Sequence, residues 1–291
     1  MPVSHTDLTI AGIPIRLETE QPLPPEEPFL PFAGPVREPK YIARFRKVEQ
    51  LPPLPDTILR ESPCDRVHPD GAGGFLRSFF DAPRCYEPYA VGTYDYPGGR
   101  ITIDYAAEGS RIVSELSPCF YHLGIESLLL QEGKFCLHAA FVKTPLGGLL
   151  FSGPSGIGKS TQADLWCRYR SSELLNGDRP ILGQRSGVWT AWGSPYAGSS
   201  RCYVNRSCPV TAVVMLAQAK TCAFHRLSPA EAFRSIYQGL TVHTWDPAFV
   251  SAALDFAARF SAEIPIYQFS CTPDEAAVDC LDAALRSERD L

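Results

Sequence analysis

The feature that most constrains the fold is a glycine-rich loop between two regular elements. Residues 149–152 (LLFS) are an apolar run typical of a buried strand, and residues 153–158 (GPSGIG) follow it with three glycines. Residues 159–170 (KSTQADLWCRYR) then read as a helix. Glycine lets the chain turn sharply, so strand, loop and helix are predicted to succeed one another directly. A buried strand needs neighbouring strands, and the sequence therefore predicts an α/β fold.

The loop fits the pattern G-x-x-x-x-G-K-[ST], which is typical of phosphate binding. Its glycines let successive backbone N–H groups turn inward around an anion, and the positive end of the following helix faces the same point. The lysine would reach the β and γ phosphates, and the serine hydroxyl would ligate Mg²⁺. A purely structural glycine turn is the alternative. The predicted nucleotide-binding residues are Gly153, Pro154, Ser155, Gly156, Ile157, Gly158, Lys159, Ser160 and Thr161.

Composition excludes several classes of protein. Of 291 residues, 45% are hydrophobic and 20% charged, which is an ordinary balance for a globular chain. The net charge of −5 argues against nucleic-acid binding, because neutralising phosphates requires clustered Lys and Arg. No apolar run approaches the roughly 18 residues of a membrane span, and the first residues do not resemble a signal peptide. A cytoplasmic location is therefore expected.

The ten cysteines suggest neither disulfides nor zinc. They are scattered without a C-x-x-C pair, and several lie in apolar surroundings. In a reducing compartment we expect buried thiols that pack as small hydrophobic groups, and no metal–thiolate site. They stand at Cys64, Cys85, Cys119, Cys136, Cys167, Cys202, Cys208, Cys222, Cys271 and Cys280.

Residues 1–115 are predicted as a β-rich N-terminal region. Many of the 27 prolines fall within residues 1–70, which favours short edge strands and irregular connections there. Residues 41–50 read as one strand, and residues 86–107 read as a hairpin around Pro-Gly-Gly. Residues 117–133 have apolar residues at helical spacing and end in glycine, which predicts a helix.

Residues 116–291 are predicted as a mixed α/β part that carries the loop. The helix starts are marked by Ser228, Asp246 and Thr272, each followed by proline, as expected of N-caps. Ser228 and Glu231 form a capping box. Strands are predicted at residues 135–142, 149–152, 172–178, 187–192, 209–219 and 264–270, and helices at 159–170, 228–237, 246–260 and 272–285.

Three polar residues near the loop are candidates for chemistry. Asp178 ends the next apolar run, so it is predicted to project toward the phosphates, although Asn-Gly-Asp is also favourable turn sequence. His138 lies on the strand before the loop, where it is either a site residue or a hydrogen-bonded core histidine. Arg179 would neutralise phosphate charge or form a surface ion pair.

These residues together resemble the catalytic core of the HPr kinase/phosphorylase family. The resemblance covers residues 136–182 well, the rest of the C-terminal part loosely and the N-terminal part hardly at all. It implies a P-loop core of the HPr kinase / phosphoenolpyruvate carboxykinase type, with a mixed and partly antiparallel sheet. It also implies that residues 153–161 bind ATP and that Ser160 and Asp178 bind Mg²⁺. Asp178 would be the general base, and His138 would lie near the phosphates.

Two departures from the family stand out: the first bears on the strength of catalysis, and the second argues against HPr as the substrate. Gly177 stands where the family has its first aspartate, which removes one carboxylate. The family stretch E-I-R-G-x-G has no counterpart in residues 193–205 (GSPYAGSSRCYVN). That segment, with Ser199 and Arg201, is either an acceptor-side loop beside Arg179 or an ordinary flexible connection.

Three functions remain open from the sequence. The leading one is an ATP- and Mg²⁺-dependent kinase acting on a hydroxyl, with a Ser or Thr of a peptide or protein as the expected acceptor. The second is a kinase for a small-molecule hydroxyl. The third is a nucleotide-dependent sensor or scaffold with weak catalysis, which the loss of a carboxylate at Gly177 favours. The family often forms oligomers, so a homo-oligomer also remains open.

Overall fold

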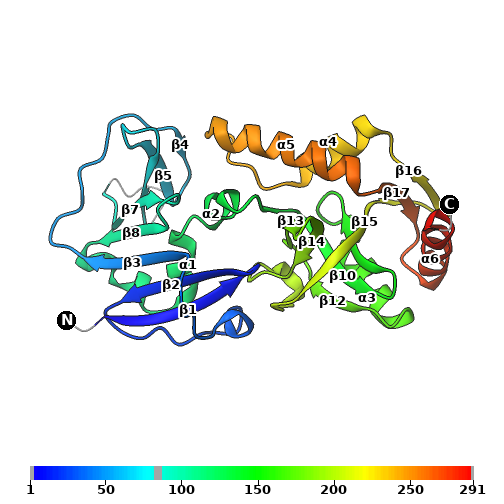
Figure 1. Ribbon diagram of the computed structural model, residues 1–291, viewed down its shortest axis with the longest axis horizontal. Helices are drawn as coiled ribbons and strands as arrows, with labels where there is room; N and C mark the ends of the chain where they lie inside the picture. Colours follow the sequence, from blue (N-terminus) through cyan, green and yellow to red (C-terminus); the bar gives the residue numbers. More distant parts are fainter. Residues whose placement is uncertain (1–2, 82–86, 290–291) are drawn as a thin grey trace. The chain divides into compact units, whose positions relative to one another are not determined.

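The computed structural model describes residues 3–81 and 87–289, which form two compact units, Met1–Gln131 and Glu132–Leu291. Of the predicted thiols, Cys85 lies outside the described residues. Both units combine strands with a few helices, and both sheets are mixed (Figure 1). The helices at 116–131, which the sequence places at the start of the C-terminal part, belong to the first unit.

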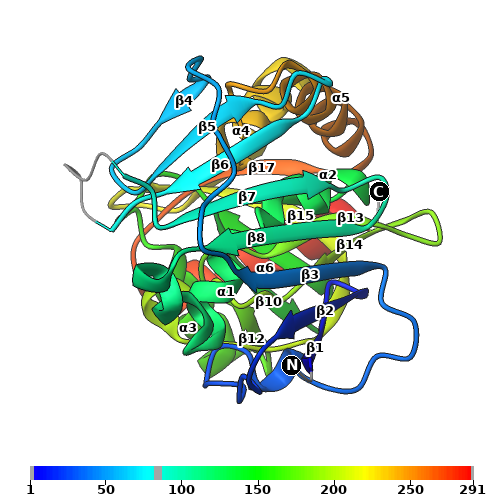
Figure 2. The same cartoon turned by 90° about the vertical axis from the view of Figure 1, so that its left-hand side faces the viewer.

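The N-terminal unit holds an eight-stranded sheet in the order β1-β2-β3-β8-β7-β6-β5-β4 within the described residues. Figure 2 shows this order from β4 at the top to β1 at the bottom. Strand β3 is parallel to both of its neighbours, and the other pairs are antiparallel. The strands are β1 Ser4–Ile10, β2 Ile13–Thr19, β3 Tyr41–Lys47, β4 Arg60–Glu61, β5 Asp65–Pro69, β6 Phe75–Phe79, β7 Ala90–Asp95 and β8 Arg100–Tyr105.

The predicted strand at 41–50 and the hairpin at 86–107 appear as β3 and as β7–β8. The prediction of short edge strands for residues 1–70 is confirmed for β4, which has two residues at one edge of the sheet, but it is wrong for the length of β1, at the other edge, and for β2. Each has seven residues, and β2 is paired on both sides. Inside these two strands buried and half-buried residues alternate, so the prolines interrupt only the connections that follow.

The single helix predicted for residues 117–133 is two helices, α1 (Leu116–His122) and α2 (Ile125–Gln131). Gly124 separates them with φ +60°, a left-handed conformation that ends a helix. The Tyr96 hydroxyl donates to the backbone oxygens of Leu123 (2.9 Å) and Gly124 (3.1 Å), which fixes the break. The apolar periodicity of the sequence continues through the break and therefore did not reveal it.

Three 3₁₀ segments complete the short elements of the described residues: η1 Leu30–Phe32, η2 Ala107–Val113 and, in the second unit, η3 Gly198–Ser200.

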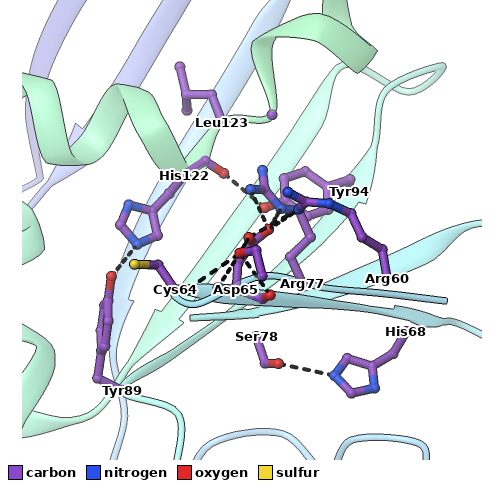
Figure 3. A network of polar contacts seen from close by, with 12 residues as sticks. Arg60, Cys64, Asp65, His68, Arg77, Ser78, Tyr89, Tyr94, His122 and Leu123 are labelled. Carbon is purple, nitrogen blue, oxygen red and sulfur yellow. Dashed lines mark hydrogen bonds and ion pairs between the residues drawn. The ribbon is translucent and has the colours of Figure 1, made fainter. Parts of the chain in front are cut away.

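A buried polar network joins the strands of the first unit to α1 (Figure 3). The Asp65 carboxylate, 1% exposed, accepts hydrogen bonds from Arg60, Ser62 and Arg77. Every charge in this cluster therefore has a partner, as a buried carboxylate requires.

His122 ends α1 beside the same network. Its Nδ1 donates to the Pro118 oxygen at 2.6 Å and its Nε2 accepts from the Tyr89 hydroxyl at 3.1 Å. The Tyr94 hydroxyl donates to the His122 backbone oxygen (Figure 3). Burial lowers the pKa of His122 to about 4, so the ring is neutral at pH 7.

The second unit is built on a nine-stranded arrangement of the described residues. Its main path runs β12-β10-β11-β15-β14-β13-β9, while β17 pairs with β15 and β16 pairs with β17. Strand β15 pairs in parallel with β11 and β17, and β10–β11 is an antiparallel hairpin. The strands are β9 Phe135–Cys136, β10 Ala139–Thr144, β11 Gly147–Ser152, β12 Glu173–Asn176, β13 Ile181–Arg185, β14 Val188–Trp192, β15 Ser207–Gln218, β16 Ala223–Arg226 and β17 Ile266–Cys271.

Helices cover this unit on both sides (Figure 1). Helices α3 (Lys159–Tyr169) and α6 (Glu275–Arg289) pack on a buried cluster formed with β10, β11, β15 and β17. Helices α4 (Pro229–Gly239) and α5 (Pro247–Glu263) pack together, and α5 contacts the aromatic rings of β9 and β14. Among residues 3–81 and 87–289, no helix is both long and apolar enough to cross a bilayer.

The predicted caps of α4 and α5 are present, whereas that of α6 is wrong. Ser228 and Glu231 form the capping box, and Asp246 accepts from the N–H groups of residues 248 and 249. Helix α6 begins at Glu275, and Asp274 accepts from the Ala277 N–H at 3.1 Å, which is an N-cap contact. A carboxylate next to the first turn replaces Thr272 in this role.

Candidate active site

The glycine-rich loop connects β11 directly to α3, which is the succession of strand, loop and helix that the sequence predicts. Gly153, Gly156 and Gly158 have φ values of +140°, +77° and +114°, which favour glycine over any residue with a Cβ. Gly158 occupies the N-cap position of α3 in a left-handed conformation and has no side chain to cap the helix. The first turn of α3 therefore leaves its N–H groups available to an outside acceptor.

Several loop amides also lack an acceptor. Within the described residues, the N–H groups of Ser155, Gly156 and Gly158 have no hydrogen-bond partner, whereas Ile157 donates to the Pro154 oxygen at 3.3 Å. Unpaired donors grouped at the positive end of a helix are suited to an anion with several oxygens.

Lys159 lies folded over this loop. Its Nζ donates to the backbone oxygens of Gly153 (3.1 Å) and Pro154 (3.0 Å), and the residue is 8% exposed. Burial lowers the pKa of Lys159, and the negative charge of Asp178 acts in the opposite direction. The ammonium group is thus already held at the loop, on carbonyl acceptors that a phosphate oxygen can replace.

Asp178 lies directly after β12, in a turn that Asn176 holds. The fully buried Asn176 accepts from the N–H groups of Asp178 (3.0 Å) and Arg179 (2.7 Å) through its Oδ1. Its Nδ2 donates to the backbone oxygens of Ser194 and Tyr196. Sequence reasoning did not single out Asn176 as a positioning residue, although Asn-Gly-Asp already indicated the turn that it forms.

The strand predicted at 135–142 is interrupted, and His138 lies in the interruption. Strand β9 ends at Cys136 and β10 begins at Ala139. The His138 N–H donates to the Gly239 oxygen at 2.8 Å, and the His138 oxygen accepts from the Ser152 hydroxyl at 2.9 Å. The backbone leaves the sheet ladder here because α4 supplies the partner, which a period-two pattern does not reveal.

His138 and Asp178 form a pair. The His138 Nδ1 lies 3.2 Å from the Asp178 Oδ1, and their side chains are 38% and 28% exposed. Burial and the charge of Lys159 lower the pKa of His138, while Asp178 raises it. A neutral ring that donates from Nδ1 would hold the carboxylate in place.

One cavity of about 300 Å³ brings most of the predicted site residues together. It lies in front of the loop and the first turn of α3. The predicted residues that line it are His138, Ser155, Gly156, Gly158, Lys159, Ser160, Thr161, Asp178 and Ser199. Gly177 and Gly198 complete the lining. We call it the phosphate cavity.

The other predicted residues lie elsewhere. Gly153, Pro154 and Arg179 line a neighbouring cavity of about 460 Å³, which also contacts His138 and the C-terminal end of α4. The Arg179 guanidinium donates to the Thr241 hydroxyl at 3.2 Å. Ile157 lines a third cavity, and Arg201, at the end of η3, lines none of these three.

Gly177 is closely covered by Ser200. A Cβ at position 177 would overlap both the Cβ and the Oγ of Ser200. Ser200 is itself fixed, because its hydroxyl donates to the Ala197 oxygen at 2.6 Å and accepts from the Cys202 N–H. A second carboxylate therefore does not fit beside Asp178 unless this segment moves.

The donor set of the phosphate cavity suits a hard cation. Its protein oxygens include the Ser160 hydroxyl and the Asp178 carboxylate. Mg²⁺ takes one or two protein oxygens together with water and phosphate oxygens, so these two side chains fit it. Within the described residues, no cluster of three or more His, Cys, Asp or Glu forms a metal site. The nine described cysteines are not in disulfides, and most are at least partly buried.

Comparison with known proteins finds similarity at the level of structure and not of sequence. No family model matches the chain, and no curated protein matches it. Among solved structures, it is similar to the Hpr(Ser) kinase/phosphatase from Coxiella burnetii. The match has 14% identity and a TM-score of 0.33, and it covers 53% of this chain and 90% of that chain.

Proposed function

We propose that this chain is an ATP-dependent kinase that transfers the γ-phosphoryl group to a hydroxyl, with a Ser or Thr of a peptide or protein as the acceptor. The observation that carries the proposal is the phosphate cavity. A phosphate-binding loop, a lysine, a serine hydroxyl and a half-exposed carboxylate all line it. These are the groups that phosphoryl transfer requires.

The loop supports binding of the triphosphate. Its unpartnered amides and the N-terminal end of α3 offer several donors to phosphate oxygens. Lys159 adds the positive charge by exchanging its two carbonyl acceptors for phosphate. Because the loop amides and the end of α3 are in place before the nucleotide arrives, these donors stabilise charge that develops on the transferred group without reorganising.

Asp178 is assigned the role of general base. Its carboxylate would accept the hydroxyl proton of the acceptor as the oxygen attacks the γ-phosphorus. His138 Nδ1 orients this carboxylate, and the Asn176 amide holds its backbone. Ser160 and Asp178 would hold Mg²⁺, which when bound neutralises charge on the β and γ phosphate oxygens.

The neighbouring cavity of about 460 Å³ supports a place for the acceptor. It meets the phosphate cavity at His138, and the consecutive residues Asp178 and Arg179 line one cavity each. Its volume is within the range of small-ligand sites. This observation also favours a second candidate function, a kinase for a small-molecule hydroxyl.

Mass spectrometry tests the proposal. The protein is incubated with ATP, Mg²⁺ and the peptides, proteins and metabolites made by the genes next to its own. A product heavier by one phosphoryl group, absent when ATP or Mg²⁺ is omitted, would support a kinase and identify its acceptor. ATP binding without any phosphorylated product would instead favour the sensor or scaffold alternative.

A further inference from the structure

A third cavity opens beside the glycine-rich loop, at the ends of two parallel strands. It has a volume of about 340 Å³. Its walls are the loop and first turn of α3 on one side, and residues 216–219 and 271–273 on the other. These two segments include and follow the carboxyl ends of β15 and β17. We call it the strand-end cavity.

The strand-end cavity adjoins the phosphate cavity along the loop and the first turn of α3. Gly156, Gly158 and Thr161 line both of them. A ligand whose phosphates contact the loop amides would therefore place the group attached to those phosphates in the strand-end cavity. Crevices at the carboxyl ends of parallel strands are common sites for such ligands.

The lining of this cavity suits a flat apolar ring with a polar edge. Ile157, Leu216, Ala217, Ala219 and Pro273 present apolar surface. Charged side chains are missing from its lining in the described part of the chain. The cavity therefore lacks the cations that a second phosphate group would need.

Gln162 supplies the polar edge. It lines the cavity and is 3% exposed, and its Nε2 donates to the Cys271 sulfur (3.2 Å) and the Thr272 oxygen (3.4 Å). Its Oε1 is buried without a partner in the described residues. This oxygen is inaccessible to solvent, so the Gln162 side chain must turn before a ligand donor reaches it, and such a donor would satisfy an acceptor that is otherwise unfavourable.

We infer that the strand-end cavity binds the nucleoside part of the nucleotide, with the base between the loop and the ends of β15 and β17. This inference rests on the proposed function, because the phosphates must occupy the loop. It assigns the base to the strand-end cavity and leaves the cavity beside Arg179 and α4 to the acceptor.

A cavity-filling variant tests the assignment. Ala219 lies half-buried just after β15, so Ala219→Phe would place a ring in the strand-end cavity from the wall opposite the loop. Calorimetric titration would compare ATP with inorganic tripolyphosphate, both with Mg²⁺, on the wild type and on this variant. Ala219→Ser, which adds one oxygen and little volume, is the matched control.

We expect wild type to bind ATP at least about tenfold more tightly than tripolyphosphate, because the base adds contacts. Ala219→Phe should lose most of this difference while its affinity for tripolyphosphate stays unchanged, which also reports that the variant is folded. Ala219→Ser should behave as wild type. Unchanged ATP affinity in Ala219→Phe, or equal wild-type affinities for ATP and tripolyphosphate, would overturn the base site alone. If neither ligand binds the wild type, the proposed function falls with it.

Discussion

Two polar clusters in this chain, one in each unit, differ in how far their charges are satisfied. In the N-terminal unit, Asp65 is 1% exposed and is surrounded by two arginines and a serine hydroxyl. In the C-terminal unit, Asp178 is 28% exposed, and its Oδ1 lies near His138 while its Oδ2 lies 3.7 Å from Arg179. The carboxylate of the first cluster is enclosed by its donors, whereas that of the second faces a cavity. A closed network of this kind stabilises a fold, whereas an open one is suited to a ligand.

The largest effect is expected at Asp178. Asp178→Asn keeps the shape of the side chain but removes the base, so phosphoryl transfer should fall by about 100- to 10,000-fold. ATP affinity should change by less than about tenfold, since the loop and Lys159 remain. Mass spectrometry of the product and calorimetric titration measure the two quantities.

Asp282→Asn is the control for this substitution. Asp282 is a carboxylate of the same unit that is closed by ion pairs with Arg170 and Arg286. Transfer should survive in Asp282→Asn. Undiminished transfer in Asp178→Asn would remove that residue as the base.

Substitutions in the closed network around Asp65 should change the stability of the fold and not the transfer reaction. Asp65→Ala leaves Arg77, whose side chain is 13% exposed, without its carboxylate, which should lower the free energy of unfolding of the N-terminal unit by about 3–5 kcal/mol. Glu61→Ala breaks only the pair with Arg66, in which Glu61 is 57% exposed, and should cost no more than about 1 kcal/mol. Chemical denaturation compares them, and equal losses would refute the distinction between closed and exposed pairs.

His122 gives the closed network a pH dependence. Its pKa is lowered to about 4, below the ordinary value of 6.5, so the unfolded chain binds its proton first as the pH falls. The stability that the neutral ring provides is complete above about pH 6.5 and is lost between pH 6.5 and 4, by up to about 3 kcal/mol. Denaturation across this range measures the slope. His122→Gln should be flatter, and an identical profile would contradict the assignment.

The smallest effect is expected at Gly177, which Ser200 covers at the edge of the open site. Gly177 does not have a positive φ, so only Ser200 opposes a side chain there. Gly177→Asp should therefore cost about 1–3 kcal/mol of unfolding free energy. The double variant Gly177→Asp/Ser200→Gly should recover much of it. Gly34→Asp, at a glycine with open space around it, is the control, and an equal loss there would show that the overlap with Ser200 is not the cause.

The local elements around the loop could be predicted because their signals are local. An apolar run, three glycines and two capping sequences are sufficient to place β11, α3, α4 and α5. The mixed α/β class followed from the same pattern, and the structure confirms it. The P-loop kinase assignment itself stays a proposal, as do the roles given to Lys159, Asp178 and His138.

The missed features depend on contacts between distant residues. The break at His138 needs the oxygen of Gly239 from α4, and the break at Gly124 needs the hydroxyl of Tyr96. The turn that carries Asp178 needs Ser194, whose backbone oxygen accepts a hydrogen bond from Asn176. Pairing of β1 with β2, and of β2 with β3, likewise depends on partners that periodicity does not specify.

The central claim is that the loop and Lys159 bind the phosphates of a nucleotide. Calorimetric titration of ATP with Mg²⁺ into wild type and Lys159→Ala tests it most directly. We expect saturable binding to the wild type and affinity reduced by about 100-fold or more in the variant, with an unchanged far-ultraviolet circular dichroism spectrum. Wild-type affinity in Lys159→Ala, or no binding of ATP to the wild type, would contradict the claim.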